Sequence, residues 1–151
     1  MILQRLLTEG RLRPHQTSAK EIADLFQVVE RDLTDASLQE LSPDRRFATA
    51  YNAALQLATI ALHAVGYRAA GTGHHWAILQ ALPEIVGPEA QGRADYLDHC
   101  RTKRNVTEYD QAGQISDAEV EEILAEVRSF RDDLLSWLRS HHRTLLPKAY
   151  G

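Results

Sequence analysis

The clearest signal of fold class is the stretch SDAEVEEILAEVRSFRDDLLSWL, residues 116–138. It opens with Ser116 and Glu119 at the spacing of a capping box, in which each side chain satisfies a backbone N–H of the first helical turn. Apolar residues then recur at steps of three and four, the period of one helix face: Val120, Ile123, Leu124, Val127, Phe130, Leu134, Trp137 and Leu138. The stretch therefore predicts one long amphipathic helix.

Two further segments upstream carry equally clear start signals. Ser18 and Glu21 repeat the capping-box spacing, and apolar residues follow at helical steps as far as residue 33. Ser42-Pro43-Asp44 supplies a capping hydroxyl, a proline at the first helical position and an acid near the positive end of the dipole. Seven of the residues from 48 to 64 are alanine, which favours helix and lets a neighbouring helix pack closely.

The rest of the chain also favours helix. We expect a short helical turn over residues 2–9, a helix over 76–86 and an unusually polar helix from about 90 to 109. No run alternates apolar and polar residues long enough to predict a strand. The sequence predicts an all-α protein, a single domain over residues 1–151 with its core at about 18–142, built as an antiparallel up-and-down bundle of four to five helices.

Composition excludes several classes of function. The 151 residues carry a net charge of −4, so bulk charge does not favour coating of nucleic acid or an anionic membrane. No apolar run approaches the roughly 20 residues that span a bilayer, and the opening residues are too interrupted for a signal peptide, so we expect no membrane association and a cytoplasmic location. The lone Cys100 forbids an intrachain disulfide; we expect it to pack, with basic neighbours lowering its pKa.

Metal-binding patterns are missing from the sequence. It has no Glu-x-x-His and no His-Glu-x-x-His, and the adjacent pairs His74-His75 and His141-His142 diverge by about 100° on a helix. Neither pair chelates alone, and Gly71-x-Gly73 lacks the spacing of a phosphate loop. We therefore predict neither a metal nor a cofactor.

The densest basic segment of this acidic chain lies within residues 99–110. On a helix, Arg101, Arg104, Asn105 and Glu108 share one face, and Tyr109 adjoins it. Guanidinium groups bind phosphate through paired donors, an amide can position a phosphate, and a phenol can stack or donate a proton. The face suits a phosphodiester, although a solvated surface with internal ion pairs explains the same charges.

The same segment resembles the signature of the HEPN family, an Arg, often followed by Asn, with a His four to six residues later on one helix. Arg104-Asn105-Val106-Thr107-Glu108-Tyr109 carries the likeness, and residues 47–54, FATAYNAA, resemble the family's "A-Y-x-A" helix. The turn from Gly66 to His75 resembles the entry into its third helix. The resemblance extends from about residue 18 to 138.

The resemblance implies a four- or five-helix bundle that dimerises so that two motifs face each other. Many members are metal-independent RNases of bacterial toxin–antitoxin or defence systems, so the implied partners are a second copy, RNA or a nucleotide, and an antitoxin protein. Arg104 takes the place of the Arg that stabilises phosphate charge. Asn105 takes the polar place, and Arg101 is a second phosphate contact. Lys103 and His99 join them as candidate binding residues.

This chain departs from the motif where the family has its His, because that place is Tyr109. A tyrosine with an ordinary pKa near 10 is a poor base at neutrality. Either Tyr109 acts as an acid with Glu108 or His99 as the base, or Arg104 and Tyr109 bind RNA or a nucleotide without cleaving it. A different class stays open beside both, a non-catalytic interaction or dimerisation module held together by the same residues.

Overall fold

The computed structural model describes residues 1–71, 74–109 and 113–151, and within 106–109 it describes the backbone alone. Its α-helices and strands, in chain order, are α1 (Ile2–Thr8), β1 (Leu12–Pro14), α2 (Ala19–Ala36), α3 (Pro43–Ala64), β2 (Tyr67–Ala69), α4 (His74–Val86), α5 (Gln91–Tyr109) and α6 (Asp117–His141). Short 3-10 turns cover 88–90, 143–145 and 148–150. The all-α prediction is confirmed.

The helix starts follow the predicted caps. The hydroxyl oxygens of Ser18 and Ser42 accept the backbone N–H of the third helical residue of α2 and α3. Ser116 and Glu119 form the complete capping box at the start of α6. These contacts are local in sequence, which explains why the three boundaries could be predicted closely.

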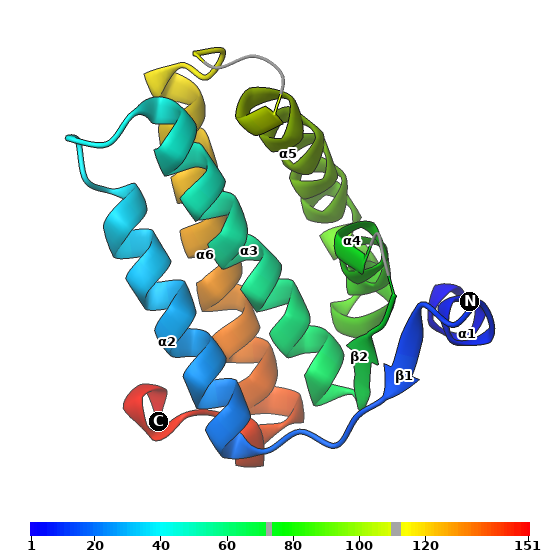
Figure 1. Cartoon of the computed structure of the whole chain (residues 1–151). Helices are drawn as coiled ribbons and strands as arrows, with labels where there is room; N and C mark the ends of the chain where they lie inside the picture. The colour runs from blue at the N-terminus through cyan, green and yellow to red at the C-terminus, as the bar shows by residue number, and fades with distance from the viewer. Residues whose placement is uncertain (72–73, 110–112) are drawn as a thin grey trace.

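Four long helices alternate in direction along the bundle (Figure 1). In that view α2 runs up, α3 down, α5 up and α6 down. Helix α3 is central, because it packs against α2, α4, α5 and α6. Its alanines at 50, 53, 54, 58 and 61 are buried, so small side chains let four neighbours approach one helix.

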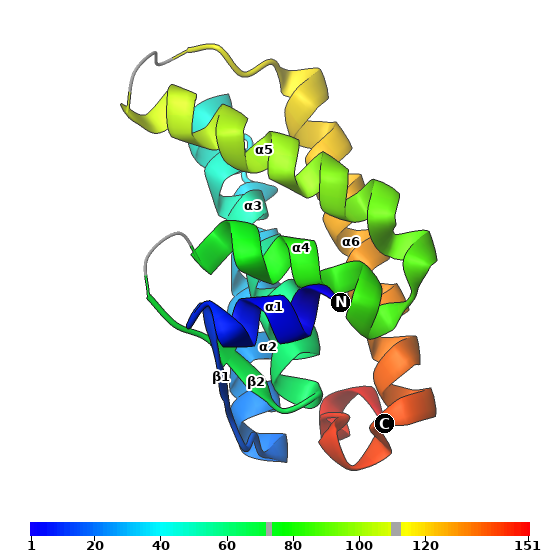
Figure 2. The same ribbon diagram turned by 90° about the vertical axis from the view of Figure 1, so that its right-hand side faces the viewer.

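Helices α1 and α4 and strands β1 and β2 lie together on one side of the bundle (Figure 2). Helices α1 and α4 lie side by side across the long helices, and α1 contributes the fully buried Leu6 to the core. The sequence did not predict β1 and β2, which pair antiparallel with Leu12 opposite Ala69. Three-residue strands show no readable alternation, and these two partners are far apart in the chain.

Among the residues whose side chains are described, the core holds two charged ones, Asp32 and Arg46. Asn52 Nδ2 donates to Asp32 Oδ2 at 2.6 Å, which joins α2 to α3. Arg46 Nε donates to the carbonyl of Ala36 at 2.8 Å and Nη2 to Glu121 Oε1 at 3.1 Å, so one guanidinium links α2, α3 and α6. Asp32 also forms an ion pair with Arg31 at 3.0 Å, so both charges are paired, as burial demands.

None of the helices in the described parts of the chain combines the length and the apolar character that a membrane span requires.

Candidate functional site

The polar helix α5 carries every residue that the sequence proposed for phosphate binding or catalysis. Ala94, Leu97 and Cys100 are its buried anchors, and the residues between them are mostly polar. The side chains of Glu108 and Tyr109 lie outside the described part of the chain, so their predicted roles remain predictions. The site can be built from residues 99 to 105.

Arg101 and Arg104, one turn apart on α5, lie toward the central helix α3. Arg101 Nε donates to Asp98 Oδ1 at 2.9 Å, and the Arg101 side chain is 27% exposed. The Cζ atom of Arg104 lies 5.6 Å from the ring centre of Tyr51, a cation–π distance. Arg104 Nη1 also donates to Asn105 Oδ1 at 3.5 Å. The structure thus brings three predicted residues together on one half-buried face.

Two residues that sequence reasoning did not place in the site complete this face. Tyr51 of α3 is buried at 1% exposure, and its hydroxyl lies 3.5 Å from Nδ1 of His75 in the first turn of α4. The two ring centres are 6.1 Å apart. Tyr51 therefore contacts both the Arg104 guanidinium and the His75 imidazole. We call the group Tyr51, His75, Arg101, Arg104 and Asn105 the arginine face.

Burial and charge set the protonation of the arginine face. Burial lowers the pKa of His75, and the nearby His74, Arg104 and Arg101 lower it further. Burial also raises the pKa of Tyr51 above its ordinary value, against the opposite influence of the two arginines. Near pH 7 both rings are consequently neutral. The two guanidinium groups supply the positive charge, and Asp98 offsets part of it.

Lys103 and His99 do not join the arginine face. Each lies two positions from Arg101, which places it about 200° around the helix. Lys103 Nζ forms an ion pair with Glu119, the capping residue of α6, and so joins α5 to α6. His99 is exposed. Their predicted role in phosphate binding stays a prediction, as do the roles of Arg101, Arg104 and Asn105.

His75 also lines a groove of about 430 Å³ between α3, β2 and α4. Asn52, Thr59 and His63 of α3 line the same groove, as does Arg68 of β2. It offers amide, hydroxyl, imidazole and guanidinium groups beside the apolar side chains of Leu55, Ala69 and Ile78. His75 therefore connects the arginine face to a polar groove along the central helix.

The environment of Cys100 corrects one expectation. We expected basic neighbours to lower the pKa of its thiol, but burial raises it to about 11, with Glu122 adding to the shift. Lys103 acts in the predicted direction and is outweighed. The thiol is 1% exposed, so it packs as expected and is not an activated nucleophile.

A metal-ligating geometry occurs at other residues. Within the described residues, His15, Glu21 and His63 place one potential ligand atom each within 4.8 Å of the others. They belong to the segment after β1, to α2 and to α3. No sequence motif connects them, since six and 42 residues separate the histidines from the glutamate.

The comparison with protein families agrees with this architecture. The model of the SAV_6107-like HEPN family matches residues 37–134, which include the arginine face and the helices α3 to α5. No curated protein and no solved structure gives a significant match. The match covers well over half of the chain, so the chain belongs to the HEPN family.

Proposed function

We propose that the arginine face binds a phosphate group of RNA or of a nucleotide. The observation that carries the proposal is the pairing of two guanidinium groups, Arg101 and Arg104, on successive turns of α5 beside a neutral imidazole. Guanidinium groups match phosphate oxygens through paired donors and keep their charge at any working pH. In a chain of net charge −4, such a focused site binds phosphate where bulk charge does not.

The same face supports metal-independent cleavage of RNA. A base removes the proton of a 2′-hydroxyl, the 2′-oxygen bonds to phosphorus, and the bond to the 5′-oxygen breaks as that oxygen gains a proton. The products are a 2′,3′-cyclic phosphate and a 5′-hydroxyl, so atoms balance without an oxidant or a metal. Arg104 would stabilise the negative charge that grows on the phosphate oxygens.

His75 is a better placed base than His99. His75 lies against Tyr51, which Arg104 also contacts, whereas His99 lies about 140° around α5 from Arg104. The lowered pKa of His75 keeps its imidazole in the neutral, proton-accepting form near pH 7. Tyr109 and Glu108 remain proposed proton-transfer groups on the same helix, one turn beyond Arg104 and Asn105.

A second function is favoured by the ion pairs of α5. Arg101 is paired with Asp98 within α5, and Lys103 is paired with Glu119 of α6, so part of the basic charge is already used inside the chain. In this alternative the chain is a non-catalytic interaction or dimerisation module. The first function requires that an RNA phosphate binds Arg101 and Arg104, whereas the second leaves both residues to contacts within the protein or the dimer.

Cleavage of a mixed RNA pool in EDTA tests the proposal. We expect cleavage by the wild-type protein, loss of at least about 100-fold in Arg104→Ala, and partial activity in Arg104→Lys, which keeps the charge but not the paired donors. His75→Asn should reduce cleavage while leaving RNA binding in place. A pool with 2′-deoxy sugars, which lacks the nucleophile, should bind without being cut.

The matched control is Arg143→Ala. Arg143 is exposed in the 3-10 turn after α6, and this turn lies at the opposite end of the molecule from the end of α5. The substitution therefore removes one positive charge far from the arginine face. It should leave cleavage unchanged. Absence of both cleavage and salt-sensitive RNA binding in the wild type would reject the phosphate proposal and leave the interaction module.

The family membership also suggests a biological setting, which we propose as a bacterial toxin–antitoxin or defence system acting in the cytoplasm. Two copies would bring two arginine faces together, and an antitoxin protein would block them. Expression in a bacterial host should then slow growth in an Arg104-dependent manner. Equal growth with the wild type and with Arg104→Ala would argue against a toxin.

A further inference from the structure

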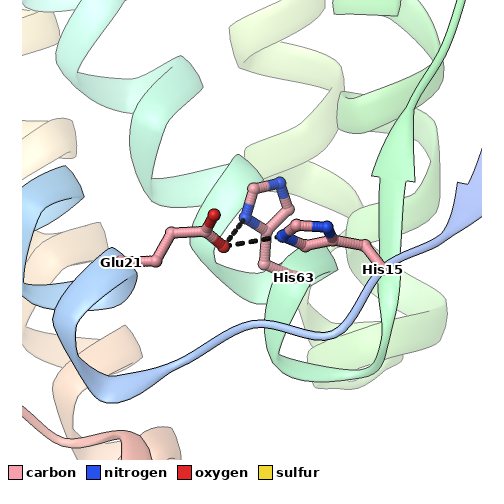
Figure 3. A group of neighbouring side chains, drawn as sticks. All are labelled: His15, Glu21 and His63. Atoms are coloured by element: carbon pink, nitrogen blue, oxygen red, sulfur yellow. Dashed lines mark hydrogen bonds and ion pairs between the residues drawn. The ribbon is translucent and has the colours of Figure 1, made fainter.

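Three potential metal ligands converge from three different elements (Figure 3). His15 lies between β1 and α2, Glu21 in the first turn of α2, and His63 in the last turn of α3. His15 Nε2 is 2.8 Å and His63 Nδ1 is 2.9 Å from the same atom, Oε1 of Glu21. Both imidazoles therefore face one carboxylate oxygen.

The fold holds these side chains in place. The backbone N–H of His15 donates to the carbonyl of Gly66 at 2.8 Å, which pins the segment after β1 beside the end of α3. Gly66 has φ of +96°, a conformation that favours glycine, and it turns the chain three residues after His63. The two imidazole centres are 4.5 Å apart. Thr17 Oγ1 donates to Glu21 Oε1 at 2.6 Å.

The charges around Glu21 and His63 bear on metal binding as well. The hydrogen bond from Thr17, supported by the two histidines, holds the pKa of Glu21 at about 2 despite partial burial. Burial lowers the pKa of His63, although Glu21 acts in the opposite direction. An ionised carboxylate and a neutral imidazole, the forms that these shifts favour at Glu21 and His63, are the forms that coordinate cations. Arg68, whose charge also lowers the pKa of His63, is the repulsive charge that a cation must overcome there.

We propose that His15, Glu21 and His63 bind a divalent cation of the Zn²⁺ class. Two imidazoles and one carboxylate form the donor set of zinc sites that keep a fourth position for water. Ligand atoms on a tetrahedral zinc with bonds of about 2.0–2.1 Å are roughly 3.3 Å apart, so the present contacts lengthen by about 0.5 Å. Each coordinating nitrogen gives up its hydrogen, and the other ring nitrogen carries it.

A bound cation would join the N-terminal segment to the region that matches the HEPN family model. His15 and Glu21 precede the region that matches the HEPN family model, residues 37–134, and His63 lies inside it. A ligand that binds the folded chain and not the unfolded one raises its unfolding temperature. This role is independent of phosphate binding at the arginine face, so either proposal can fail alone.

Titration of the metal-free protein with Co²⁺ or Zn²⁺ tests the site. Co²⁺ should bind one to one with the intense visible absorption of tetrahedral coordination, and Zn²⁺ should displace it. The informative variants are His15→Gln and His63→Asn, because their carboxamide nitrogens stand where Nε2 and Nδ1 donate to Glu21. They keep the hydrogen bonds and lose the imidazole ligands.

If the three residues coordinate the metal, each variant should fold as the wild type does in the absence of metal. Its affinity for Co²⁺ should fall by more than the roughly 10–100-fold that follows from changing a residue that only contacts a metal ligand. Circular dichroism melts without metal check the fold. The control His141→Gln/His142→Gln removes the histidine pair beside Trp137 and should bind Co²⁺ unchanged. Unchanged binding in His15→Gln and His63→Asn, loss of binding in the control, or no wild-type binding at all would overturn the proposal.

Discussion

Arg104 is the residue on which the phosphate proposal depends. Its guanidinium lies over the ring of Tyr51 and beside Asn105, so its position is fixed before any ligand arrives. A preorganised guanidinium loses less freedom on binding than a flexible surface charge does. This is why the expected effect of Arg104→Ala is large, whereas removal of an exposed arginine should have little effect.

Part of the arginine face could be predicted from the sequence. Helix geometry alone places Arg101, Arg104 and Asn105 on one surface, because their spacing is local. Tyr51 and His75 could not be predicted, since their approach depends on how α3 and α4 pack against α5. The adjacent histidines at 74 and 75 fit no metal-binding motif, and both they and Tyr51 stand out in the sequence only through the family resemblance.

The environment of Cys100 predicts how fast its thiol reacts. It is the single cysteine, and burial raises its pKa to about 11. At pH 8.5 a thiol with a pKa of about 11 is almost entirely protonated, whereas about half of an unfolded cysteine with a pKa near 8.5 is ionised. Iodoacetamide should therefore alkylate the native protein at least about tenfold more slowly than the protein in guanidinium chloride, as measured by mass spectrometry. Equal rates of alkylation would show that the Cys100 side chain is not buried in the native protein.

His75 gives a pH dependence. A lowered pKa means that the folded state favours the neutral imidazole, so RNA cleavage that uses His75 as a base should fall only when the pH drops below the ordinary value of about 6.5. The rate should stay level from there to neutrality. A rate that still rises between pH 7 and 9 would point to another base, and the profile of His75→Asn identifies which group titrates.

At the scale of elements, α6 depends on its capping box. The Ser116 hydroxyl accepts the N–H of Glu119 at 3.1 Å, and Glu119 Oε1 accepts the N–H of Ser116 at 3.0 Å. Ser116→Ala should lower the free energy of unfolding by about 1 kcal/mol in urea titrations. Ser136→Ala, an exposed mid-helix change, should stay within about 0.5 kcal/mol. Equal effects of the two would contradict a role for the cap.

Arg46 joins three helices, so its loss should lower the free energy of unfolding more than the loss of a helix cap does. Replacement by leucine removes the donors to the Ala36 carbonyl and to Glu121, and it leaves the carbonyl without its partner inside the core. We expect a loss of about 2–3 kcal/mol in the free energy of unfolding. The neighbouring Arg45 is exposed, and Arg45→Ala should cost less than about 0.5 kcal/mol. A small effect of Arg46→Leu would mean that solvent reaches this carbonyl.

The helices were predictable because their signals are local, and the small sheet was not. Capping serines and three-to-four spacing identify α2, α3 and α6 from a few consecutive residues. Helix α4 begins at His74, two residues before its predicted start. The β1–β2 pairing joins Leu12 to Ala69, and only the folded bundle brings these segments together.

At the scale of the whole molecule, net charge and local charge lead to different expectations. A chain of net charge −4 should bind RNA weakly through its general surface, while the arginine face should bind a small number of phosphates. The dependence of RNA affinity on salt counts those phosphates, because each neutralised phosphate of a single strand contributes about 0.7 to the slope of log K against log salt.

The most direct test compares this salt slope in three proteins, with a single-stranded RNA as the ligand: the wild type, Arg104→Ala and Arg143→Ala. The phosphate proposal predicts a finite slope for the wild type, a slope lower by about 0.7 with weaker binding for Arg104→Ala, and no change for Arg143→Ala. Equal slopes in all three proteins, or no measurable binding by the wild type at low salt, would contradict it.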